Sequence, residues 1–321
     1  MGTYNNDIID VVIVGSGPAG LSAAIYTKRA GLKVLVIEKE YMGTGQIAYS
    51  DRVDNYLGIP AVSGYELGEN FRNHAISLGV EIADGDVTTI KRVDDTGKLT
   101  IDNQEADKAA LWRVELSDES YRLARTVIYA AGSHHRHLGL DEENQFIGKG
   151  VSYCAVCDGA FFKDKNVVVA GGGNSALGDA IYLSDICSNV YIVHRRAEFR
   201  GDLVTLERLK ERKNVHFITG VTICALKGGN KLEEVVLNDG QVIKADGLFV
   251  AIGMEPATSI LKGVVSLDKT GYIIAGENCV TSAPGLYAAG DVRTKEVRQL
   301  ITAAADGANA ASNAIKYIRN V

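Results

Sequence analysis

The sequence predicts an α/β fold made of two Rossmann-like three-layer domains, one of them inserted into the other. Two observations carry this prediction: a strand, a glycine-rich turn and a helix stand near the start of the chain, and the same order recurs far along it. A third is a strand, turn and helix near the end, which we expect to rejoin the first domain. The expected bounds are 1–135 and 256–321 for the first domain and 136–255 for the second.

The first glycine-rich turn follows residues 8–14, which are typical of a buried parallel strand. A helix is predicted over 21–30 and a second strand over 33–37. Glu38 follows that strand, where a carboxylate can accept both hydroxyls of an adenosine ribose while the turn faces a pyrophosphate. The pattern predicts a dinucleotide site, and the glycines of its turn are Gly15, Gly17 and Gly20.

The second turn repeats this design after a predicted strand at 166–170. A helix is expected from the turn to about residue 187, and a second strand over 190–193. At the position equivalent to Glu38 stands His194, so the acidic residue is absent here. The turn itself contains Gly171, Gly173 and Ala176.

Cations follow the second unit where the first has its carboxylate: Arg195, Arg196 and Arg200. A carboxylate would repel the 2′-phosphate of NADP, whereas guanidinium groups pair with it, often through two hydrogen bonds. The second site is therefore predicted to bind NADPH rather than NADH. A solvated basic turn is the alternative interpretation.

The end of the chain indicates what the first site binds. Residues 286–289 form a predicted strand that runs into Gly290 and Asp291, and a helix of small residues is expected over 300–311. In flavoproteins with two dinucleotide sites, such a Gly-Asp pair holds the ribityl and phosphate groups, and a helix N-terminus faces the isoalloxazine. We therefore expect FAD in the first domain, although a plain strand, turn and helix is also compatible. Arg298 and Gln299 precede the helix.

Cys154 and Cys157 lie between the two dinucleotide units and form the only pair of cysteines with close spacing. Two cysteines three positions apart can close a small disulfide, and N–H groups at a helix start stabilise a thiolate. Asp158 follows directly and can donate or accept the proton that dithiol chemistry needs. A zinc site would require a second ligand pair at suitable spacing, which the sequence lacks. A buried pair without redox function remains the other alternative.

Other cysteines and histidines are expected to be structural. Cys187, Cys224 and Cys279 stand alone and are predicted to fill apolar space. The cluster of His134, His135 and His137 is interpreted as part of a polar crossover loop. Residues 94–111 are predicted to form an extended polar hairpin of unassigned role.

Composition excludes several partners. The net charge of −6 comes without a Lys/Arg block, which argues against nucleic acid and an anionic membrane surface. No apolar run approaches the roughly 20 residues needed to span a bilayer. The first ten residues are polar and acidic, unlike a signal peptide, so a soluble, cytoplasmic protein is expected.

The chain resembles the low-molecular-weight thioredoxin reductases over essentially its whole length. The resemblance rests on an ordered set of motifs: GSGPAG at 15–20, GQI at 45–47, CAVCDG at 154–159, GGGNSA at 171–176, HRRAEFR at 194–200, and GD followed by RQ near the end. It implies that Cys157 faces the flavin, that Cys154 attacks the substrate disulfide, and that Asp158 is the acid and base. It also implies a homodimer and thioredoxin, or a thioredoxin-like protein, as the partner.

The same resemblance extends the sites of both cofactors. The FAD positions that match are Gly15, Ser16, Gly17, Ala19, Gly20, Glu38, Gly45, Gln46, Asn55, Asp291, Arg298 and Gln299. The NADPH positions that match are Asn174, Ser175, Arg195, Arg196 and Arg200.

Departures from the family pattern leave alternatives open. Gly178 and Asp179 stand where the family has two acidic residues, and Glu255 and Ala257 flank the proline of IGMEPAT. Relatives that take electrons from ferredoxin have lost the arginine set, which this chain retains. A dithiol oxidase that passes electrons to oxygen would not need these arginines, and a flavin-binding module without activity would not need the cysteine pair.

Overall fold

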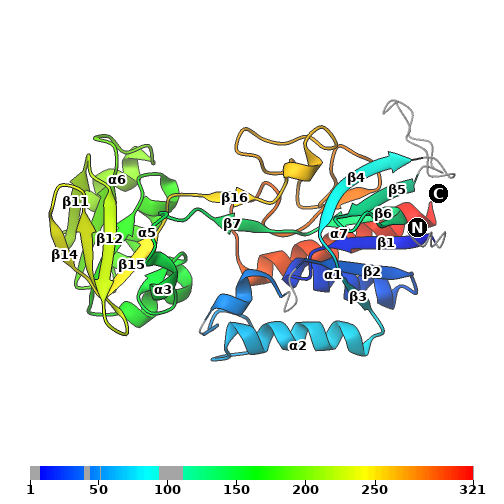
Figure 1. The fold of residues 1–321 in the computed structure, drawn as a ribbon, viewed down its shortest axis with the longest axis horizontal. Helices are drawn as coiled ribbons and strands as arrows, with labels where there is room; N and C mark the ends of the chain where they lie inside the picture. The colour runs from blue at the N-terminus through cyan, green and yellow to red at the C-terminus, as the bar shows by residue number, and fades with distance from the viewer. Residues whose placement is uncertain (1–7, 40–43, 51, 94–110, 321) are drawn as a thin grey trace. The chain divides into compact units, whose positions relative to one another are not determined.

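The computed structural model describes residues 8–39, 44–50, 52–93 and 111–320 (Figure 1). These residues divide into two compact units, one of residues 1–51, 56–134 and 255–321 and the other of residues 52–55 and 135–254. The chain passes from one unit to the other within β7 (Ser133–His135) and β16 (Met254–Pro256), which pair with each other. None of the helices in these described ranges is long and apolar enough to cross a membrane.

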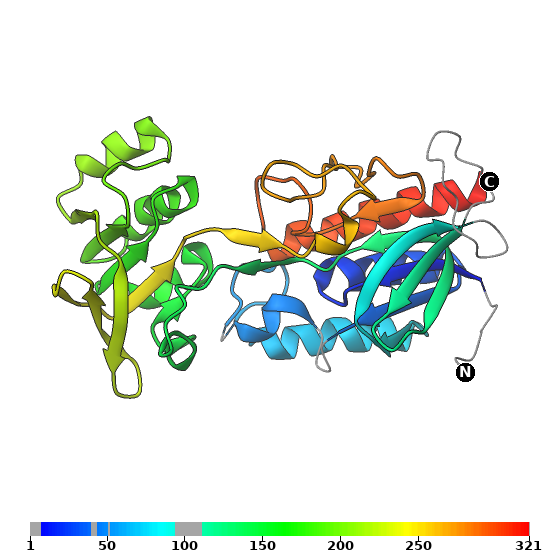
Figure 2. The same ribbon diagram turned by 45° about the horizontal axis from the view of Figure 1, so that its top comes forward.

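The first unit is built on a seven-stranded sheet in which five strands are parallel. β1 (Ile9–Val14) lies between β2 (Val34–Glu38) and β6 (Tyr121–Tyr129), and β3 (Glu81–Asp84) extends the sheet beyond β2. The far side of β6 pairs with β17 (Leu286–Ala288) at one end and with an antiparallel ribbon at the other. The ribbon consists of β4 (Val87–Val93) and β5 (Leu111–Leu116), drawn as curved arrows in Figure 2.

Side chains of β1 alternate between two faces of this sheet, as the period of a strand requires. Val11 and Ile13 pack against helices, whereas Val12 and Val14 face the ribbon side. The helices of the first unit are α1 (Pro18–Arg29), α2 (Gly64–Ser77) and α7 (Leu300–Arg319), with short 3₁₀ turns at Gly45–Tyr49 and Ser259–Leu261. The unit therefore has three layers, and each face of its sheet is covered.

The second unit repeats this plan around a five-stranded sheet in the order β11-β10-β9-β15-β8, all parallel. Val167 and Val169 of β9 pack against helices, while Val168 and Ala170 pack against a three-stranded antiparallel sheet. The strands are β8 (Val151–Ser152), β9 (Asn166–Ala170), β10 (Asn189–His194), β11 (Val215–Thr219), β12 (Ile223–Gly228), β13 (Leu232–Leu237), β14 (Val242–Lys244) and β15 (Gly247–Val250). The helices are α3 (Glu143–Phe146), α4 (Ala155–Asp158), α5 (Asn174–Ser184) and α6 (Leu203–Lys210), with a 3₁₀ turn at Gly159–Phe162.

The structure confirms the predicted α/β class and its two parallel sheets. Three predicted helix boundaries were wrong. Helix α1 begins earlier than predicted, at Pro18 in the turn itself, α5 ends at Ser184, and α7 continues to Arg319. The last helix is longer because Ala310, Ala311 and Ala314 continue one buried face that packs against the first helix. The predicted polar hairpin at 94–111 lies outside the described residues, except for Leu111.

Candidate functional site

The first glycine-rich turn joins β1 to α1 through a conformation that only glycine adopts without strain. Gly15 has φ of +97°, and a Cβ there would lie 2.6 Å from the carbonyl oxygen of Ala130. Gly20 allows an equally close approach, because a Cβ would lie 1.9 Å from the carbonyl oxygen of Gly15. Gly17 is the N-cap residue of α1, and no side chain accepts a hydrogen bond from the N–H groups at this end of the helix. A bound pyrophosphate can accept hydrogen bonds from these N–H groups.

Glu38, the last residue of β2, contacts the first glycine-rich turn. Its Oε2 accepts hydrogen bonds from the Ser16 amide at 2.6 Å and from the Ser16 hydroxyl at 2.8 Å. The structure thus brings the predicted acid into contact with the turn, although the two are far apart in sequence. Gly45 also lies against the turn, since a Cβ there would be 3.3 Å from the Cα of Gly17.

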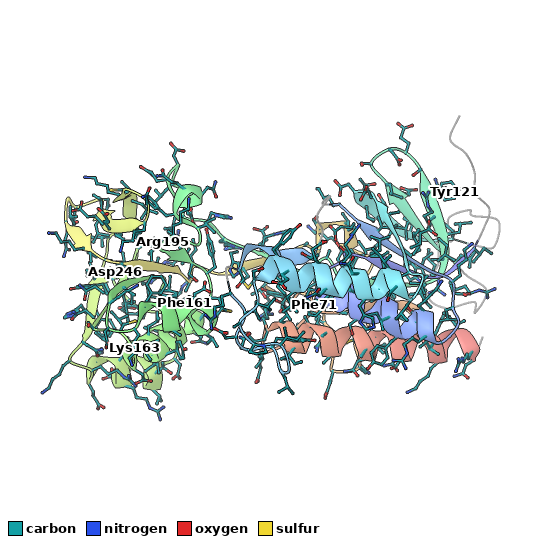
Figure 3. All side chains as sticks on the ribbon, turned by 90° about the horizontal axis from the view of Figure 1, so that it is seen from below. Phe71, Tyr121, Phe161, Lys163, Arg195 and Asp246 are labelled. Atoms are coloured by element: carbon teal, nitrogen blue, oxygen red, sulfur yellow. A yellow bond between two sulfur atoms is a disulfide. The ribbon has the colours of Figure 1, made fainter. Side chains whose placement is uncertain are left out.

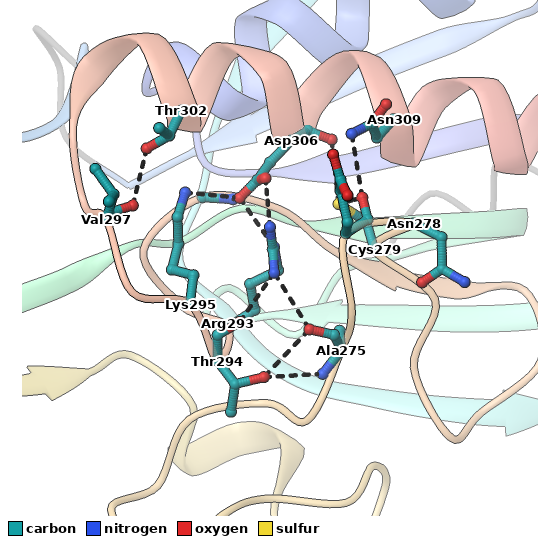
Figure 4. A network of polar contacts seen from close by, with 12 residues as sticks. Ala275, Asn278, Cys279, Arg293, Thr294, Lys295, Val297, Thr302, Asp306 and Asn309 are labelled. Carbon is teal, nitrogen blue, oxygen red and sulfur yellow. Dashed lines mark hydrogen bonds and ion pairs between the residues drawn. The ribbon is translucent and has the colours of Figure 1, made fainter.

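A buried network of charges supports the Gly290–Asp291 turn (Figure 4). Asp306 of α7 is only 4% exposed. Its carboxylate accepts a hydrogen bond from the Gly290 amide at 3.0 Å. It also accepts hydrogen bonds from the Arg293 guanidinium at 2.6 and 2.9 Å and from the Lys295 ammonium at 2.9 Å. Lys295 also lies 3.9 Å from Asp291 Oδ1. The single carboxylate of Asp306 therefore joins the backbone of the turn to two cations that follow it.

Two polar atoms beside this network have no hydrogen-bond partner. Asp291 Oδ1 and Arg298 Nε are both buried without one. Burial raises the pKa of Asp291, and the neighbouring cations Lys295 and Arg298 oppose that rise. The Arg298 guanidinium lies 4.2 Å from the centre of the Tyr272 ring, which holds it in place. A buried acceptor and a buried donor without partners fit a polar ligand that offers both kinds of group.

Cys154 and Cys157 form a disulfide with a Cα–Cα distance of 5.3 Å, as their spacing predicts. Cys154 caps α4, and its Sγ accepts a hydrogen bond from the Cys157 amide at 3.2 Å. Asp158 is the last residue of α4, and its Oδ2 accepts a 2.6 Å hydrogen bond from the hydroxyl of Ser152. All three predicted redox residues therefore lie in a single turn of chain, and each is half-buried.

The second glycine-rich turn also starts with a glycine at positive φ. Gly171 has φ of +148°, and a Cβ there would lie 2.4 Å from the carbonyl oxygen of Ala251. His194 packs directly on the turn, because a Cβ on Gly172 would lie 2.4 Å from its ring. The ring is 5% exposed, stacks on Phe199 at 5.2 Å, and leaves Nε2 without a hydrogen-bond partner. Burial, with the nearby arginines, lowers the pKa of His194.

Three arginines follow β10 in the segment that returns to this turn. Arg195, labelled in Figure 3, is exposed, as are Arg196 and Arg200. The backbone amide of Arg200 donates to the carbonyl of Gly172 at 2.8 Å, which holds the arginine segment next to the turn. The predicted cations and the turn therefore lie together, with Asn174 at the start of α5.

Some predicted residues have other surroundings. Gln46 is exposed and its amide donates to the backbone carbonyl of Ser133. Asn55 groups with the second unit rather than with the first turn. Gln299 caps α7 through a capping box with Thr302. Ser175 is exposed in α5.

Two structural expectations were wrong. Cys224 is exposed, although Cys187 and Cys279 are buried as predicted. His135 belongs to strand β7 and stacks on Tyr153 at 4.9 Å, so the histidine cluster is more than a polar loop. His137 Nδ1 donates a 2.8 Å hydrogen bond to the hydroxyl of the same tyrosine, because that hydroxyl gives its own proton to Glu143.

Glu143 completes this histidine–tyrosine cluster. Its carboxylate is 1% exposed and accepts hydrogen bonds from the Tyr153 hydroxyl at 2.7 Å and from the amides of Leu138 and Gly139 at 3.1 Å. Burial and the contact with Glu143 raise the pKa of Tyr153. The cluster fixes the residue that precedes Cys154.

Two Rossmann-like units, one of which also carries a redox disulfide, define the class of two-domain disulfide oxidoreductases. A profile described as pyridine nucleotide-disulphide oxidoreductase matches residues 9–308. Thioredoxin reductases of Listeria monocytogenes and Mycoplasma genitalium are 38% and 40% identical to this chain, covering 98% and 96% of it and 95% of their own lengths.

A solved structure of thioredoxin reductase from Streptococcus pyogenes is similar, with a TM-score of 0.88 and 35% identity over 99% of this chain and 100% of its own. The chain belongs to the pyridine nucleotide-disulphide oxidoreductase family and, within it, to the low-molecular-weight thioredoxin reductases.

Proposed function

We propose that this protein reduces thioredoxin, or a similar protein disulfide, with electrons from NADPH that pass through FAD to Cys154 and Cys157. The observation that carries this proposal is the closed Cys154–Cys157 disulfide beside Asp158. The arginine-bearing turn lies in the same unit, which supports NADPH as the donor.

The first unit fits FAD in the chemistry of its unpartnered atoms. The buried Asp291 Oδ1 requires a hydrogen-bond donor, and the hydroxyls of a ribityl chain supply donors. The buried Arg298 Nε requires an acceptor, which a phosphate or a flavin carbonyl supplies. The N–H groups at the start of α1 fit the pyrophosphate, and Glu38 fits the adenosine ribose. When bound, FAD supplies a carrier that accepts a hydride and delivers two electrons.

The second unit fits NADPH through its cations. Arg195, Arg196 and Arg200 would bind the 2′-phosphate, and the N–H groups at the start of α5 would bind the pyrophosphate. His194 has a buried Nε2 that a ligand atom can satisfy. No carboxylate stands at the position equivalent to Glu38, so nothing there repels the extra phosphate.

The cysteine pair performs the exchange with the substrate. We infer that Cys154 attacks the partner disulfide and that Cys157 then resolves the mixed disulfide, with Asp158 moving the protons. We further propose a homodimer, as the family resemblance implies; sedimentation equilibrium would test it.

One assay tests the proposed function. NADPH added to the FAD-loaded protein without oxygen should bleach the flavin absorbance, and oxidised thioredoxin should then restore it while gaining two thiols per disulfide. A protein bleached by reduced ferredoxin but not by NADPH would contradict the donor, and one that oxygen alone reoxidises would indicate a dithiol oxidase instead.

A further inference from the structure

Ser152 lies at the end of β8, two residues before the first redox cysteine, and its side chain is 6% exposed. The strand holds it firmly, because Ser152 and Phe249 are register partners in the parallel pair of β8 and β15. No motif in the sequence singles this serine out. Its surroundings assign it a role in the exchange chemistry.

The hydroxyl of Ser152 connects the backbone of Cys154 to the carboxylate of Asp158. The Cys154 amide donates to Ser152 Oγ at 3.1 Å, and Ser152 Oγ donates to Asp158 Oδ2 at 2.6 Å. A second acceptor, the carbonyl of Cys154, lies farther from the hydroxyl, at 3.4 Å. A hydroxyl has one proton, and the shorter contact to a carboxylate is the stronger hydrogen bond.

The direction of this chain of hydrogen bonds is fixed. A backbone N–H can only donate, so the hydroxyl must accept from Cys154 and direct its own proton at the carboxylate. Donation from the amide polarises the hydroxyl and strengthens its bond to Asp158. One side chain, anchored on a strand of the sheet, therefore sets the position of a carboxylate on the neighbouring short helix.

We propose that Ser152 is a positioning residue that holds the Asp158 carboxylate in the orientation needed for proton transfer during thiol–disulfide exchange. The proposal rests on the proposed function, because it assigns Asp158 the proton transfers of that reaction. It goes beyond the family motif, which ends at the cysteines and the acid.

The exchange shows where the oriented carboxylate acts. Asp158 first takes the proton of the Cys154 thiol. The Cys154 thiolate then attacks one sulfur of the partner disulfide, whose S–S bond breaks as a mixed disulfide forms, and the departing partner sulfur takes that proton from Asp158. Asp158 next takes the proton of the Cys157 thiol, and that sulfur attacks Cys154. The Cys154–Cys157 bond re-forms, and the second partner sulfur leaves with the proton that Asp158 took from Cys157. Two electrons and both cysteine hydrogens have then left the enzyme dithiol.

Ser152→Ala tests the proposal in the step that Asp158 serves. The dithiol form, prepared with dithiothreitol and freed of it, would be mixed with oxidised thioredoxin, and the single-turnover rate of enzyme disulfide formation measured. We expect a rate about tenfold lower than that of the unchanged protein, because a misoriented acid loses part of the roughly 10²-fold or greater contribution of acid–base catalysis. NADPH takes no part in this measurement.

A double-mutant cycle separates positioning from a general structural effect. Asp158→Ala should lower the rate by about 10²-fold, and Ser152→Ala added to it should cost less than about twofold more. Ser184→Ala is the matched control, since it removes a buried hydroxyl that bonds to Ile181 and Arg212 in the same unit. It should leave the rate unchanged. Losses that multiply in the double variant would overturn the proposal.

Ser152→Thr keeps the hydroxyl, so it keeps the proposal testable if the alanine variant fails to fold. It should retain the exchange rate within about threefold, and a loss as large as that of Ser152→Ala would also overturn the proposal. The proposed function fails separately, when the unchanged protein transfers no electrons from NADPH to thioredoxin. An active unchanged protein whose Ser152→Ala variant exchanges equally fast would refute only the role of Ser152.

Discussion

The two units share a backbone plan but differ at one structural position, the end of the second strand. In the first unit Glu38 stands there and binds the amide and hydroxyl of Ser16 in the turn. In the second unit His194 stands there, packed on Gly172 and followed by exposed arginines. The glycines with positive φ that open the turns, Gly15 and Gly171, are alike in both.

This difference is the one that the proposed binding of FAD by the first unit and NADPH by the second requires. The glycines and the helix N-terminus provide what every dinucleotide shares, a pyrophosphate that accepts N–H hydrogen bonds. In the proposed complexes the strand end faces the ribose, where NADPH carries an additional phosphate. Replacing the acid there with His194 and placing arginines directly after it changes the expected ligand, while the strand, turn and helix stay the same.

The largest expected effect tests whether the first unit depends on its buried charges. Asp306→Asn leaves the buried Arg293 without its paired carboxylate and leaves Lys295 with only the longer 3.9 Å contact to Asp291, so the free energy of unfolding should fall by about 3–5 kcal/mol. Asp185→Asn removes a carboxylate that is 60% exposed and pairs with Arg212 in the second unit, and it should cost less than about 1 kcal/mol. Urea unfolding followed by flavin release and by circular dichroism measures both; equal midpoints would contradict the expected difference.

The next effect concerns the choice of nucleotide at the second strand end. Arg195→Ala combined with Arg196→Ala should raise the KM for NADPH by tens-fold, since each charge-assisted hydrogen bond contributes about 1.5–3 kcal/mol. The KM for NADH should change little, because NADH has no 2′-phosphate. Lys227→Ala, on the exposed antiparallel sheet, is the control. An equal increase in KM for both nucleotides would show that the arginines do not bind the 2′-phosphate.

A smaller effect compares one glycine near the start of α1 with one in α5. Gly20→Ala places a methyl group 1.9 Å from the Gly15 carbonyl oxygen, which should force the turn apart and destabilise the protein by about 1–3 kcal/mol. Gly178→Ala in α5 meets nothing within 4 Å and should stabilise it by up to about 1 kcal/mol. Thermal unfolding would show whether each substitution raises or lowers the free energy of unfolding. A Gly20→Ala variant that is as stable as the unchanged protein and retains FAD would disprove the close approach of Gly20 to Gly15.

The smallest effect is a pH dependence confined to α5. Burial raises the pKa of Asp179 to about 6, whereas the buried residues of α1 are uncharged. Because the folded protein holds this proton more tightly than the unfolded chain, stability from this group is present below pH 4 and is lost as the pH rises through 6. Asp179→Asn should therefore be more stable than the unchanged protein at pH 8, by about 1–3 kcal/mol, and the gain should vanish near pH 4. A gain that is the same at both pH values would contradict this.

Features that depend on neighbouring residues were predictable from the sequence. The two turns, the strands on either side of them and the cysteine pair all follow from local patterns, so Gly15, Gly171 and the Cys154–Cys157 disulfide lie where expected. The predicted burial of Cys224 was wrong, because successive side chains of a strand point to opposite faces. Ile223 faces the core from β12, so the next side chain must face away from it.

The supporting residues were not predictable in the same way, because their contacts join separate elements. Asp306 and Ser152 belong to no motif, and each acts on a residue of another element. A signal for Asp306 did exist: it shares one helical stripe with Ala303, Ala310 and Ala314, which are buried. A charge on such a stripe requires a partner, and Arg293 is the nearby cation.

The interrupted first unit has a consequence for synthesis on the ribosome. Strand β17 and helix α7, which complete its sheet and cover α1, are made after the second unit, whose residues 135–254 are continuous. At roughly 5–20 residues per second, the second unit is complete about 3–13 seconds before α7. For that interval the nascent chain carries a folded cysteine pair without the unit proposed to reduce it, so the first oxidation state of this pair is set by the surrounding cell rather than by the enzyme itself.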